Sequence, residues 1–524
     1  MERVKFKTNS LTIMGALLLI VVLLFKTESS PIWQTNTWVD TNAMLTVGRS
    51  VLSGELPFRD FFEQRGPVLY GIYAIAATIS SKNFLGVFII EVIAMVATFY
   101  VFILLAKVFF RNNLLVVESA FLAECIVISS TSMQQGGSPE ELVAPAIAYA
   151  GYVVIRYGLN INRYQLIILS ALFSVVFWVK YSLIGIWVIY YLVYFAMKIF
   201  KRDRRGLCDF LIFSVLGFSL ITLPIVLAYI HSGSLHYLIS EYFVTNITGY
   251  ASEDSGNMWK RILGTIIPNV KRHFILGTVI ICTLMYKILF HGYTDDKRDR
   301  LKYGLLFVMI LGQYFFMNIG GRTYDYYFMP IIVIGGLLTI VATGLLRVKN
   351  EKRLAGLMIS GLGLLVIGSA VSAWRVGPYS TAEYIQTNIK AGQRFNKLIN
   401  QLEKEKSSTN TLQFGGIDNG MYLATGKIIP QKYFNNPNFS YEQNPKILDS
   451  QFGYFKNKQV EFVITTPLND EVLDYYLKHR NKAVKLKGCA TLVPKVLADN
   501  YTLIDKVAST NSKDEEFLLF HRKS

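Results

Sequence analysis

The sequence has few charged residues for its length. Asp, Glu, Lys and Arg make up 17% of its 524 residues, whereas they make up about 25% of an ordinary soluble domain. Apolar residues account for 52% of the chain and are gathered into long runs. Apolar runs of about 20 residues are typical of helices that cross a bilayer. This pattern excludes a soluble globular protein and predicts an α-helical polytopic membrane protein.

Cysteines and acidic residues are also few. The four cysteines lie far apart, at Cys125, Cys208, Cys282 and Cys489, so their spacing predicts neither a disulfide framework nor a metal site. Basic residues outnumber acidic ones by 53 to 36, which gives a net charge of +17. In a membrane protein, basic residues mainly set the orientation of the spans. We therefore expect the lipid bilayer, and no nucleic acid, as a partner.

The first apolar run, residues 11–25, is predicted to be a transmembrane helix rather than a signal peptide. No small-residue cleavage site follows it, and many further apolar runs do, which favours a retained helix. Arg3, Lys5 and Lys7 precede it. Because basic flanks stay on the cytoplasmic side, the N-terminus is predicted to be cytoplasmic.

The remaining apolar runs predict ten further spans. They cover 84–108, 113–131, a helix from about 142 to the basic residues near 156, 165–179, 183–199, 208–230, 273–291, 303–318, 328–346 and 354–374. With eleven spans, the basic loops 201–206, 295–302 and 347–353 all lie in the cytoplasm, as expected. The run at 67–81 is short for a span, and if it crossed, all three loops would lie outside. We therefore predict a re-entrant or interfacial helix at 67–81.

The composition changes after residue 375. Residues 376–524 are polar, are rich in Lys and Asn, and contain no run long enough to cross a bilayer. Apolar spacing predicts a helix over 381–403, and short strands are predicted over 411–415, 460–465, 501–508 and 516–521. We therefore predict two domains, a transmembrane domain at 1–375 and a small extracytoplasmic α/β domain at 376–524.

The stretch 38–70, which follows the first span, is dense in ionisable residues. Its charged residues include Asp40, Arg59, Asp60, Glu63 and Arg65. Gly54 and Pro57 break the amphipathic helix with which it begins. Ionisable groups at a membrane boundary are costly unless they line a wet cavity or bind a charged ligand. We therefore expect a functional site here.

Seven ionisable residues share one outer side in the predicted topology. They are Asp40, Glu63, Arg65, Glu140, Glu141, Lys180 and Arg322. Taken singly, several have a structural explanation. A helix cap would explain Asp40, and the acidic first turn of a helix would explain Glu140 and Glu141. Lys180 would be a snorkelling side chain, and Arg322 would anchor an interfacial aromatic belt.

Taken together, these residues suit a substrate that carries a phosphate group. Arg and Lys neutralise the charge on a departing phosphate. A carboxylate acts as a general base when it removes a proton from an attacking hydroxyl. No metal-ligand cluster stands out beyond the carboxylates, so the metal is left unassigned.

Several features of the sequence match a known pattern. They are Asp40 in the first outer loop, FEQRGPVLY at 62–70, GSPEE at 137–141, Lys180 after the fifth span, and GRTYDYY at 321–327. In these features the chain resembles polytopic glycosyltransferases of the GT-C fold that use polyprenyl-phosphate sugars. The protein-mannosyltransferase and lipid A aminoarabinose-transferase branch, glycosyltransferase family 39-like, is the most similar. The resemblance covers about the first 330 residues and implies a GT-C-like membrane domain with interfacial helices in its first outer loop.

The resemblance implies catalytic roles for three acidic residues. Asp40 would be the catalytic base. Glu140 or Glu141 would be the second acid, which positions the acceptor or the donor. Thr41 stands where many relatives have another acid, so the usual acid pair is reduced to one carboxylate.

The resemblance also implies a set of substrate-binding residues. They are Glu63, Arg65, Lys180, Arg322, Tyr324 and Tyr326. Arg65, Lys180 and Arg322 would hold the lipid phosphate of the donor. Arg65 replaces the commoner Lys, which keeps the charge but changes the donor geometry, and Tyr326 stands where relatives often have His. Metal use varies in the family, so no cofactor is assigned and a divalent cation stays open.

We expect an inverting, polyprenyl-phosphate-sugar-dependent glycosyltransferase at the outer face of a bacterial cytoplasmic membrane. Its acceptor would be a wall polysaccharide, a teichoic acid, a lipid or a protein of the cell envelope. A transporter or flippase of a lipid-linked sugar is one alternative, although transporters often show two related halves, which this sequence lacks. A cell-wall assembly scaffold is the other, and it would leave the charges from Arg59 to Arg65 unexplained.

Overall fold

The computed structural model describes most of the chain. The described residues are 10–133, 136–248, 258–289, 297–319, 324–345, 383–402, 410–436, 438–508 and 516–524. The predicted span 354–374 lies outside them. The chain folds into two compact units. One consists of Met1–Ile32, Phe88–Leu227 and Gly256–Arg375, and the other of Trp33–Val87, Ala228–Ser255 and Val376–Ser524. The predicted domain division at residue 375 stays a prediction.

The described secondary structure of the first unit is helical. Its main helices are α1 (Ser10–Lys26), α4 (Leu85–Phe109), α5 (Asn113–Ser129), α6 (Pro139–Leu142), α7 (Ala144–Tyr157), α8 (Arg163–Val179), α9 (Gly185–Phe200), α10 (Arg204–His231), α13 (Met258–Gly264), α14 (Ile266–Arg272), α15 (Phe274–Leu289), α16 (Lys297–Asn318) and α17 (Met329–Leu345). Short 3₁₀ helices cover Tyr181–Leu183 and Asp325–Phe328. These positions agree closely with the predicted spans before residue 346.

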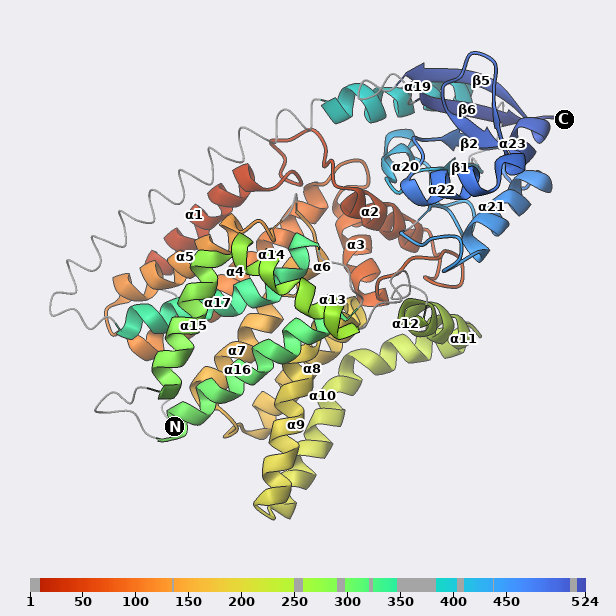
Figure 1. The fold of residues 1–524 in the computed structure, drawn as a ribbon. Coiled ribbons are helices and arrows are strands. Elements are labelled where there is room, and N and C mark those ends of the chain that lie inside the picture. Colours follow the sequence, from red (N-terminus) through yellow and green to blue (C-terminus); the bar gives the residue numbers. More distant parts are fainter. Residues whose placement is uncertain are drawn as a thin grey trace. The chain divides into compact units, whose positions relative to one another are not determined.

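Helix α17 forms the core of this unit. Every residue from Met329 to Val341 is buried, and the helix packs against α5, α7 and α15 (Figure 1). A helix that is apolar on all sides is stable inside a protein core or in lipid, and α17 has no polar face to turn toward water. Its composition is therefore compatible with its buried position.

Several helices are long and apolar enough to cross a membrane. They are α4, α10, the segment Asp299–Asn318 of α16, and Asp325–Leu345, which ends with α17. The pair Ile262–Arg272 and Phe274–Leu289, bent by 103°, gives a fifth span if it is counted as one. Among the described residues, four more apolar helices have 10 to 17 residues. The predicted helical membrane protein is confirmed, and the total of eleven spans stays a prediction.

Two regions differ from the predicted helices. The span predicted to start at 142 is divided into α6 and α7 at Val143. Pro145 lies in the first turn of α7, where a residue without an N–H group is tolerated, and this favours a new helix start.

The stretch 231–272, interpreted as polar, contains short helices that were missed because their polar and apolar residues alternate closely. Among them are α11 (Leu235–Tyr237), a π-helix (Leu238–Thr245), α12 (Asn246–Thr248), α13 and α14.

The second unit contains the helices of the first predicted outer loop, α2 (Val39–Leu52) and α3 (Pro67–Ile79). They pack side by side (Figure 1). A Cβ atom at Gly48 of α2 would lie 2.5 Å from the backbone C and O atoms of Tyr73 in α3, so this contact requires glycine. Helix α3 is about 20 Å long at 1.5 Å per residue, which is shorter than the hydrocarbon core of a bilayer. Its length agrees with an interfacial or re-entrant helix.

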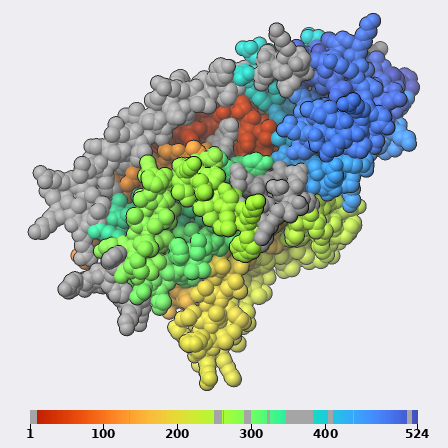
Figure 2. Space-filling view, viewed as in Figure 1, coloured from red at the N-terminus to blue at the C-terminus, as the bar shows by residue number. Residues whose placement is uncertain are grey.

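The C-terminal part of the second unit is a small α/β fold, drawn in blue in Figure 2. Its sheet has the order β1-β2-β6-β5, in which β1 and β2 are parallel and the other pairs antiparallel. The strands are β1 (Thr411–Phe414), β2 (Phe462–Thr465), β5 (Tyr501–Ala508) and β6 (Glu516–Arg522). They match the four predicted strands within two residues at each end, so the predicted α/β domain is confirmed.

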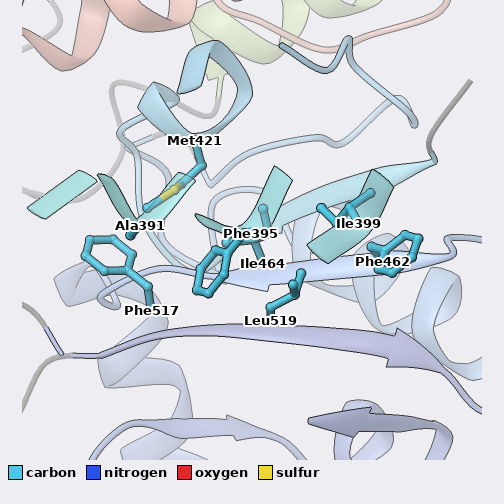
Figure 3. Close-up of a cluster of buried hydrophobic side chains, with 8 residues drawn as sticks. All are labelled: Ala391, Phe395, Ile399, Met421, Phe462, Ile464, Phe517 and Leu519. Carbon is cyan, nitrogen blue, oxygen red and sulfur yellow. The ribbon is translucent and has the colours of Figure 1, made fainter. Parts of the chain in front are cut away.

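The remaining elements surround this sheet. They are a π-helix (Ile385–Ile389), α19 (Lys390–Leu402), α20 (Gly420–Thr425), α21 (Lys446–Lys456), α22 (Asp470–Lys478), a 3₁₀ helix (Arg480–Lys482), the pair β3 (Ala483–Lys485) and β4 (Leu492–Pro494), and α23 (Lys495–Asn500). Ala391, Phe395 and Ile399 of α19 point toward the sheet in Figure 3. Their i, i+4 spacing places them on one helical face. This face forms the core with buried residues Met421, Phe462, Ile464, Phe517 and Leu519.

The contact between α2 and α3 gives a first prediction. We expect Gly48→Ala to lower the free energy of unfolding by about 1–3 kcal/mol, because the added methyl group meets backbone that has no room to move. Gly71→Ala in α3 is the matched control, because its Cβ would have no neighbour within 4 Å. Thermal unfolding of the purified variants tests this. Equal melting temperatures for the two variants would show that the helices are not held this closely.

Candidate functional site

Asp40 lies in the first turn of α2. Trp38 is the N-cap residue of this helix and makes no side-chain cap hydrogen bond. Asp40 is therefore not the N-cap residue of α2. Its Oδ2 atom lies 2.5 Å from Nη2 of Arg65. The helix start brings the carboxylate of Asp40 to a residue 25 positions later in the chain.

Arg65 lies between two carboxylates. Besides Asp40, its Nη1 atom contacts Oε1 of Glu63 at 2.7 Å. The side chains of Arg65, Asp40 and Glu63 are 13%, 21% and 4% exposed. One guanidinium between two carboxylates leaves a net charge of −1. The structure therefore brings together the three predicted site residues of the first outer loop.

Glu63 is held by its neighbours in the same segment. Its Oε2 atom accepts a hydrogen bond from the hydroxyl of Tyr70 and another, of 3.0 Å, from the backbone N–H of Arg65. Tyr70 lies in the first turn of α3, after the Gly66–Pro67 start of that helix. A buried carboxylate without such partners would be strongly destabilising. Tyr70, which was not among the predicted site residues, therefore positions Glu63, and its place in the FEQRGPVLY string was the signal for it.

The C-terminal residues of the second unit hold α2 at both ends. Asn42, two residues after Asp40, donates hydrogen bonds to the carbonyls of Asn36 and Trp38 and to the hydroxyl of Tyr384. Tyr384 in turn donates to Oδ2 of Asp418 at 2.6 Å. Burial raises the pKa of Asp418 above its usual value.

At the other end of α2, the buried Arg49 donates to the backbone carbonyl of Tyr422 at 3.1 Å. The hydroxyl of Ser50 accepts a hydrogen bond from the N–H of Ile429. Sequence reasoning missed these contacts because they join residues more than 300 positions apart.

In the first unit, the GSPEE string forms the start of α6. Ser138 is the N-cap, and its hydroxyl accepts from the N–H of Glu141 at 3.1 Å. Oε2 of Glu141 accepts from the N–H groups of Gly137 and Ser138, at 2.9 and 3.3 Å. This is a capping box, in which a Ser and a Glu three residues later satisfy each other's backbone donors. The carboxylate of Glu141 therefore stabilises its own helix.

Glu140 has a different environment. It is fully buried, and its Oε1 atom lies 2.5 Å from Nζ of Lys180. Lys180 follows α8 directly, and its ammonium group lies 3.7 Å from the ring centroid of Tyr327. Within the described residues, Oε2 of Glu140 has no hydrogen-bond partner. The snorkelling interpretation of Lys180 therefore misses its main contact, which is an ion pair with Glu140.

The tyrosines of the GRTYDYY string pack next to Lys180. Tyr324 and Tyr326 stack with their ring centroids 5.5 Å apart, and the ammonium group of Lys180 lies 5.4 Å from the ring of Tyr326. Cation–π contacts of this kind favour a charged ammonium. Arg322 lies outside the described residues. Tyr327, which was not predicted, makes the shorter contact with Lys180.

A further carboxylate was missed in the sequence. Glu91 of α4 is fully buried, and its Oε2 atom accepts a hydrogen bond of 3.0 Å from the hydroxyl of Thr27. A Cβ atom at Gly136 would clash with both side chains. Glu91 is the one acidic residue of this 25-residue helix, whose other charged residue, Lys107, lies in the last turn. An acidic residue in the middle of such an apolar helix is by itself a functional or packing signal, and it was available in the sequence.

The carboxylates are not arranged as a metal centre in the part of the chain that the structure describes. No three His, Cys, Asp or Glu side chains there are grouped so that they could hold an ion. Each of the two predicted acid clusters has instead a basic partner, Arg65 or Lys180. The question of a divalent cation stays open.

Comparison of the chain with known proteins identifies its fold. No family model matches the chain, and no curated protein matches it either. Solved structures do match, among them two of ArnT from Cupriavidus metallidurans. The structure bound to undecaprenyl phosphate covers 97% of both chains, with a TM-score of 0.54 and 12% identity. The apo structure covers 98% of both, with a TM-score of 0.55 and 12% identity. The chain has the fold of ArnT.

The ArnT fold confirms the structural part of the resemblance seen in the sequence. ArnT is a GT-C glycosyltransferase, the lipid A aminoarabinose transferase, and the predicted GT-C-like fold is thereby established. The match covers almost all of both chains, so it includes the C-terminal residues as well as the membrane helices. At 12% identity, the likeness to ArnT establishes the fold alone, and the roles of individual residues stay predictions.

The capping box predicts different effects for two variants of Glu141. Glu141→Ala should lower the free energy of unfolding by about 0.5–2 kcal/mol, the usual cost of losing a helix cap. Glu141→Gln should restore the wild-type melting temperature, because an amide oxygen accepts the same backbone hydrogen bonds. Thermal unfolding in detergent measures both. A Gln variant as unstable as the Ala variant would rule out the capping role.

A pH dependence follows from Glu55, in the turn after α2. Burial raises its pKa from 4.5 to about 7, so the folded protein binds this proton more tightly than the unfolded chain does. The stability that Glu55 contributes is therefore complete below pH 4.5 and is lost as the pH rises to about 7. Glu55→Gln should remove this dependence. Melting temperatures between pH 4.5 and 7.5 test it, with Asp499→Asn, an exposed residue of α23, as control.

Proposed function

We propose that the protein is a membrane glycosyltransferase that transfers a sugar from a polyprenyl-phosphate donor to an acceptor of the cell envelope. Two observations support this. The chain has the fold of ArnT, one of whose structures binds undecaprenyl phosphate. Within this fold, Arg65 joins two carboxylates near the start of α2 and α3. The second observation carries the proposal. A partly exposed guanidinium is able to bind the donor phosphate, and the carboxylate beside it is able to act as the general base.

Arg65 would bind the phosphate of the donor. A guanidinium presents a planar fork of N–H donors that matches phosphate oxygens. In the structure, Asp40 occupies one arm of this fork. A donor phosphate would take the place of Asp40 on Arg65, while Glu63, which is held by Tyr70, would keep the guanidinium in position. This exchange would free the carboxylate of Asp40 when the donor is bound.

Asp40 would then act as the general base. Its side chain is 21% exposed, compared with 4% for Glu63, so it is the more accessible of the two carboxylates. In the proposed step an acceptor hydroxyl attacks the anomeric carbon, and the bond from that carbon to the phosphate oxygen breaks. The proton of the hydroxyl passes to Asp40, and polyprenyl phosphate leaves. Attack opposite the leaving group inverts the anomeric centre.

Glu140, rather than Glu141, would be the second acid. Glu141 uses its carboxylate to cap α6, whereas Glu140 has one oxygen paired with Lys180 and the other without a partner among the described residues. A carboxylate in a buried site with a spare oxygen is able to position a hydroxyl group by hydrogen bonding. Lys180 would add a positive charge for the anionic donor. The rings of Tyr324 and Tyr326 would provide an apolar surface for its sugar or prenyl chain.

The predicted topology implies that this reaction occurs on the outer side of the membrane. The N-terminus would lie in the cytoplasm, and residues 376–524 would lie outside, on the side where the acceptor is found. The acceptor is a wall polysaccharide, a teichoic acid, a lipid or a protein, as the sequence resemblance implies. A divalent cation has no role in the steps proposed here.

The first experiment compares Asp40→Asn with Asp60→Asn in membranes supplied with radiolabelled polyprenyl-phosphate sugars. We expect Asp40→Asn to lower the transfer rate by 10²–10⁴-fold, the usual contribution of a general base, while the donor still binds. Asp60 is a matched control, because it lies in the same outer loop and forms its own ion pair with Arg59 at 2.6 Å. We expect Asp60→Asn to keep transfer close to the wild-type rate.

Two outcomes would contradict the proposal. Full transfer by Asp40→Asn would assign the base to another carboxylate. If the wild-type protein transferred no sugar from any donor but moved the donor across the membrane, the protein would be a flippase. Melting temperatures of both variants show whether a lost activity reflects unfolding.

A further inference from the structure

The C-terminal residues of the second unit contain a groove. It lies between the turn 440–443 and helix α22, and its volume is about 540 Å³. Pockets of about 300–1,000 Å³ are typical of small-molecule sites. The residues that line it come from one unit, and none of them belongs to the site described above. The groove therefore needs an explanation of its own.

The groove is strongly acidic. Its carboxylates are those of Glu442, Asp470, Glu471 and Asp474. Lys478 is the one basic residue in the lining, and its ammonium group lies 3.2 Å from Asp474 and 3.6 Å from Glu442. The formal charge of the lining is therefore −3. A ligand with phosphate or carboxylate groups would be repelled from it.

One wall of the groove is aromatic. Tyr441 and Tyr475 both line it, and their ring centroids lie 4.6 Å apart. Tyr441 is fixed by hydrogen bonds between its hydroxyl and the two carboxylate oxygens of Asp449, at 3.2 and 3.3 Å. An aromatic ring presents an apolar face and a polar edge. Such a face packs well against the C–H side of a pyranose ring.

A small cavity of about 10 Å³ adjoins the groove and shares Ser440, Tyr441 and Glu471 with it. Asn436 lines this cavity and is only 3% exposed. Neither its Nδ2 nor its Oδ1 atom has a hydrogen-bond partner in the described chain. Nε2 of Gln443, in the groove, has none there either. Buried polar groups are normally satisfied, directly or through water. A ligand hydroxyl in the groove would satisfy the amide of Gln443 directly, and one water molecule in the small cavity would join the amide of Asn436 to it.

The simpler explanation covers only part of this arrangement. Asp470 and Glu471 lie in the first turn of α22, where acidic side chains favour the helix dipole, and Asn469 caps the helix. This accounts for two of the carboxylates. It does not account for the buried, unpaired amide of Asn436 or for the aromatic wall.

We propose that this groove binds an oligosaccharide that carries no phosphate or carboxylate group. Sugar hydroxyls donate to the carboxylates, accept from the amide of Gln443 and reach the amide of Asn436 through a water molecule. The sugar ring packs on Tyr441, and an amine-bearing sugar gains from the negative charge. Binding in this groove is independent of sugar transfer. If the proposed function holds, on which this last step rests, the bound glycan is the acceptor or its extension.

The test uses the full-length protein in nanodiscs and calorimetric titration with tetramers of glucose, N-acetylglucosamine and glucosamine. We expect at least one tetramer to bind, and poly(glycerol phosphate) not to bind. Tyr441→Ala and, separately, Glu442→Gln should weaken binding at least tenfold. Glu442 is 63% exposed, so its variant keeps the fold if the Tyr441 variant does not. Asp499→Asn, an exposed acid outside the groove, is the matched control and should bind as the wild type does.

Several outcomes would overturn the proposal. They are no binding of any tetramer, equal binding by wild type and both groove variants, preferred binding of poly(glycerol phosphate), or binding of Ca²⁺ alone. The transfer assay with Asp40→Asn is run separately on the same preparations. Transfer without glycan binding would contradict the proposed glycan site and support the proposed enzyme. Glycan binding without transfer would support the glycan site and contradict the enzyme.

Discussion

The ion pairs of Arg65 hold the candidate site of the second unit together. One guanidinium joins Asp40 at the start of α2 to Glu63 before α3, and Tyr70 supports Glu63 from α3 itself. Glu63 is almost fully buried, so removing Arg65 would leave a buried charge without its partner, which is far more costly than losing an exposed pair. The arrangement depends on the close approach of α2 and α3 at Gly48, since a larger residue there would separate the two helix starts.

The same helix is joined to the C-terminal α/β fold. Asn42 meets Tyr384, and Arg49 meets the carbonyl of Tyr422, so the C-terminal residues contact α2 near both of its ends. Asp40 lies two residues before Asn42 and is positioned by this framework. The C-terminal residues therefore form part of the support of Asp40, which gives them a structural role in addition to any contact with the acceptor.

Two adjacent acids of the first unit illustrate how environment separates roles. Glu140 and Glu141 are both fully buried, yet Glu141 caps its own helix and Glu140 pairs with Lys180, which follows α8. The difference arises because successive side chains of a helix point about 100° apart. Glu141 turns back to its own N-cap, whereas Glu140 faces Lys180. Burial alone would not have distinguished them.

The sequence by itself determined the class of the protein. Long apolar runs, positive loops and a polar C-terminal region were sufficient to predict a helical membrane protein with an α/β domain, because period and hydropathy are local properties. Glu63 and Arg65 of the FEQRGPVLY string and the two acids of the GSPEE string were predicted as site residues from the resemblance of these short motifs to a known family. Only the tertiary structure decided their partners. The pairing of Asp40 with Arg65, the choice between Glu140 and Glu141, and the groove beside Asn436 depend on contacts between distant segments, and a single sequence contains no direct record of such contacts.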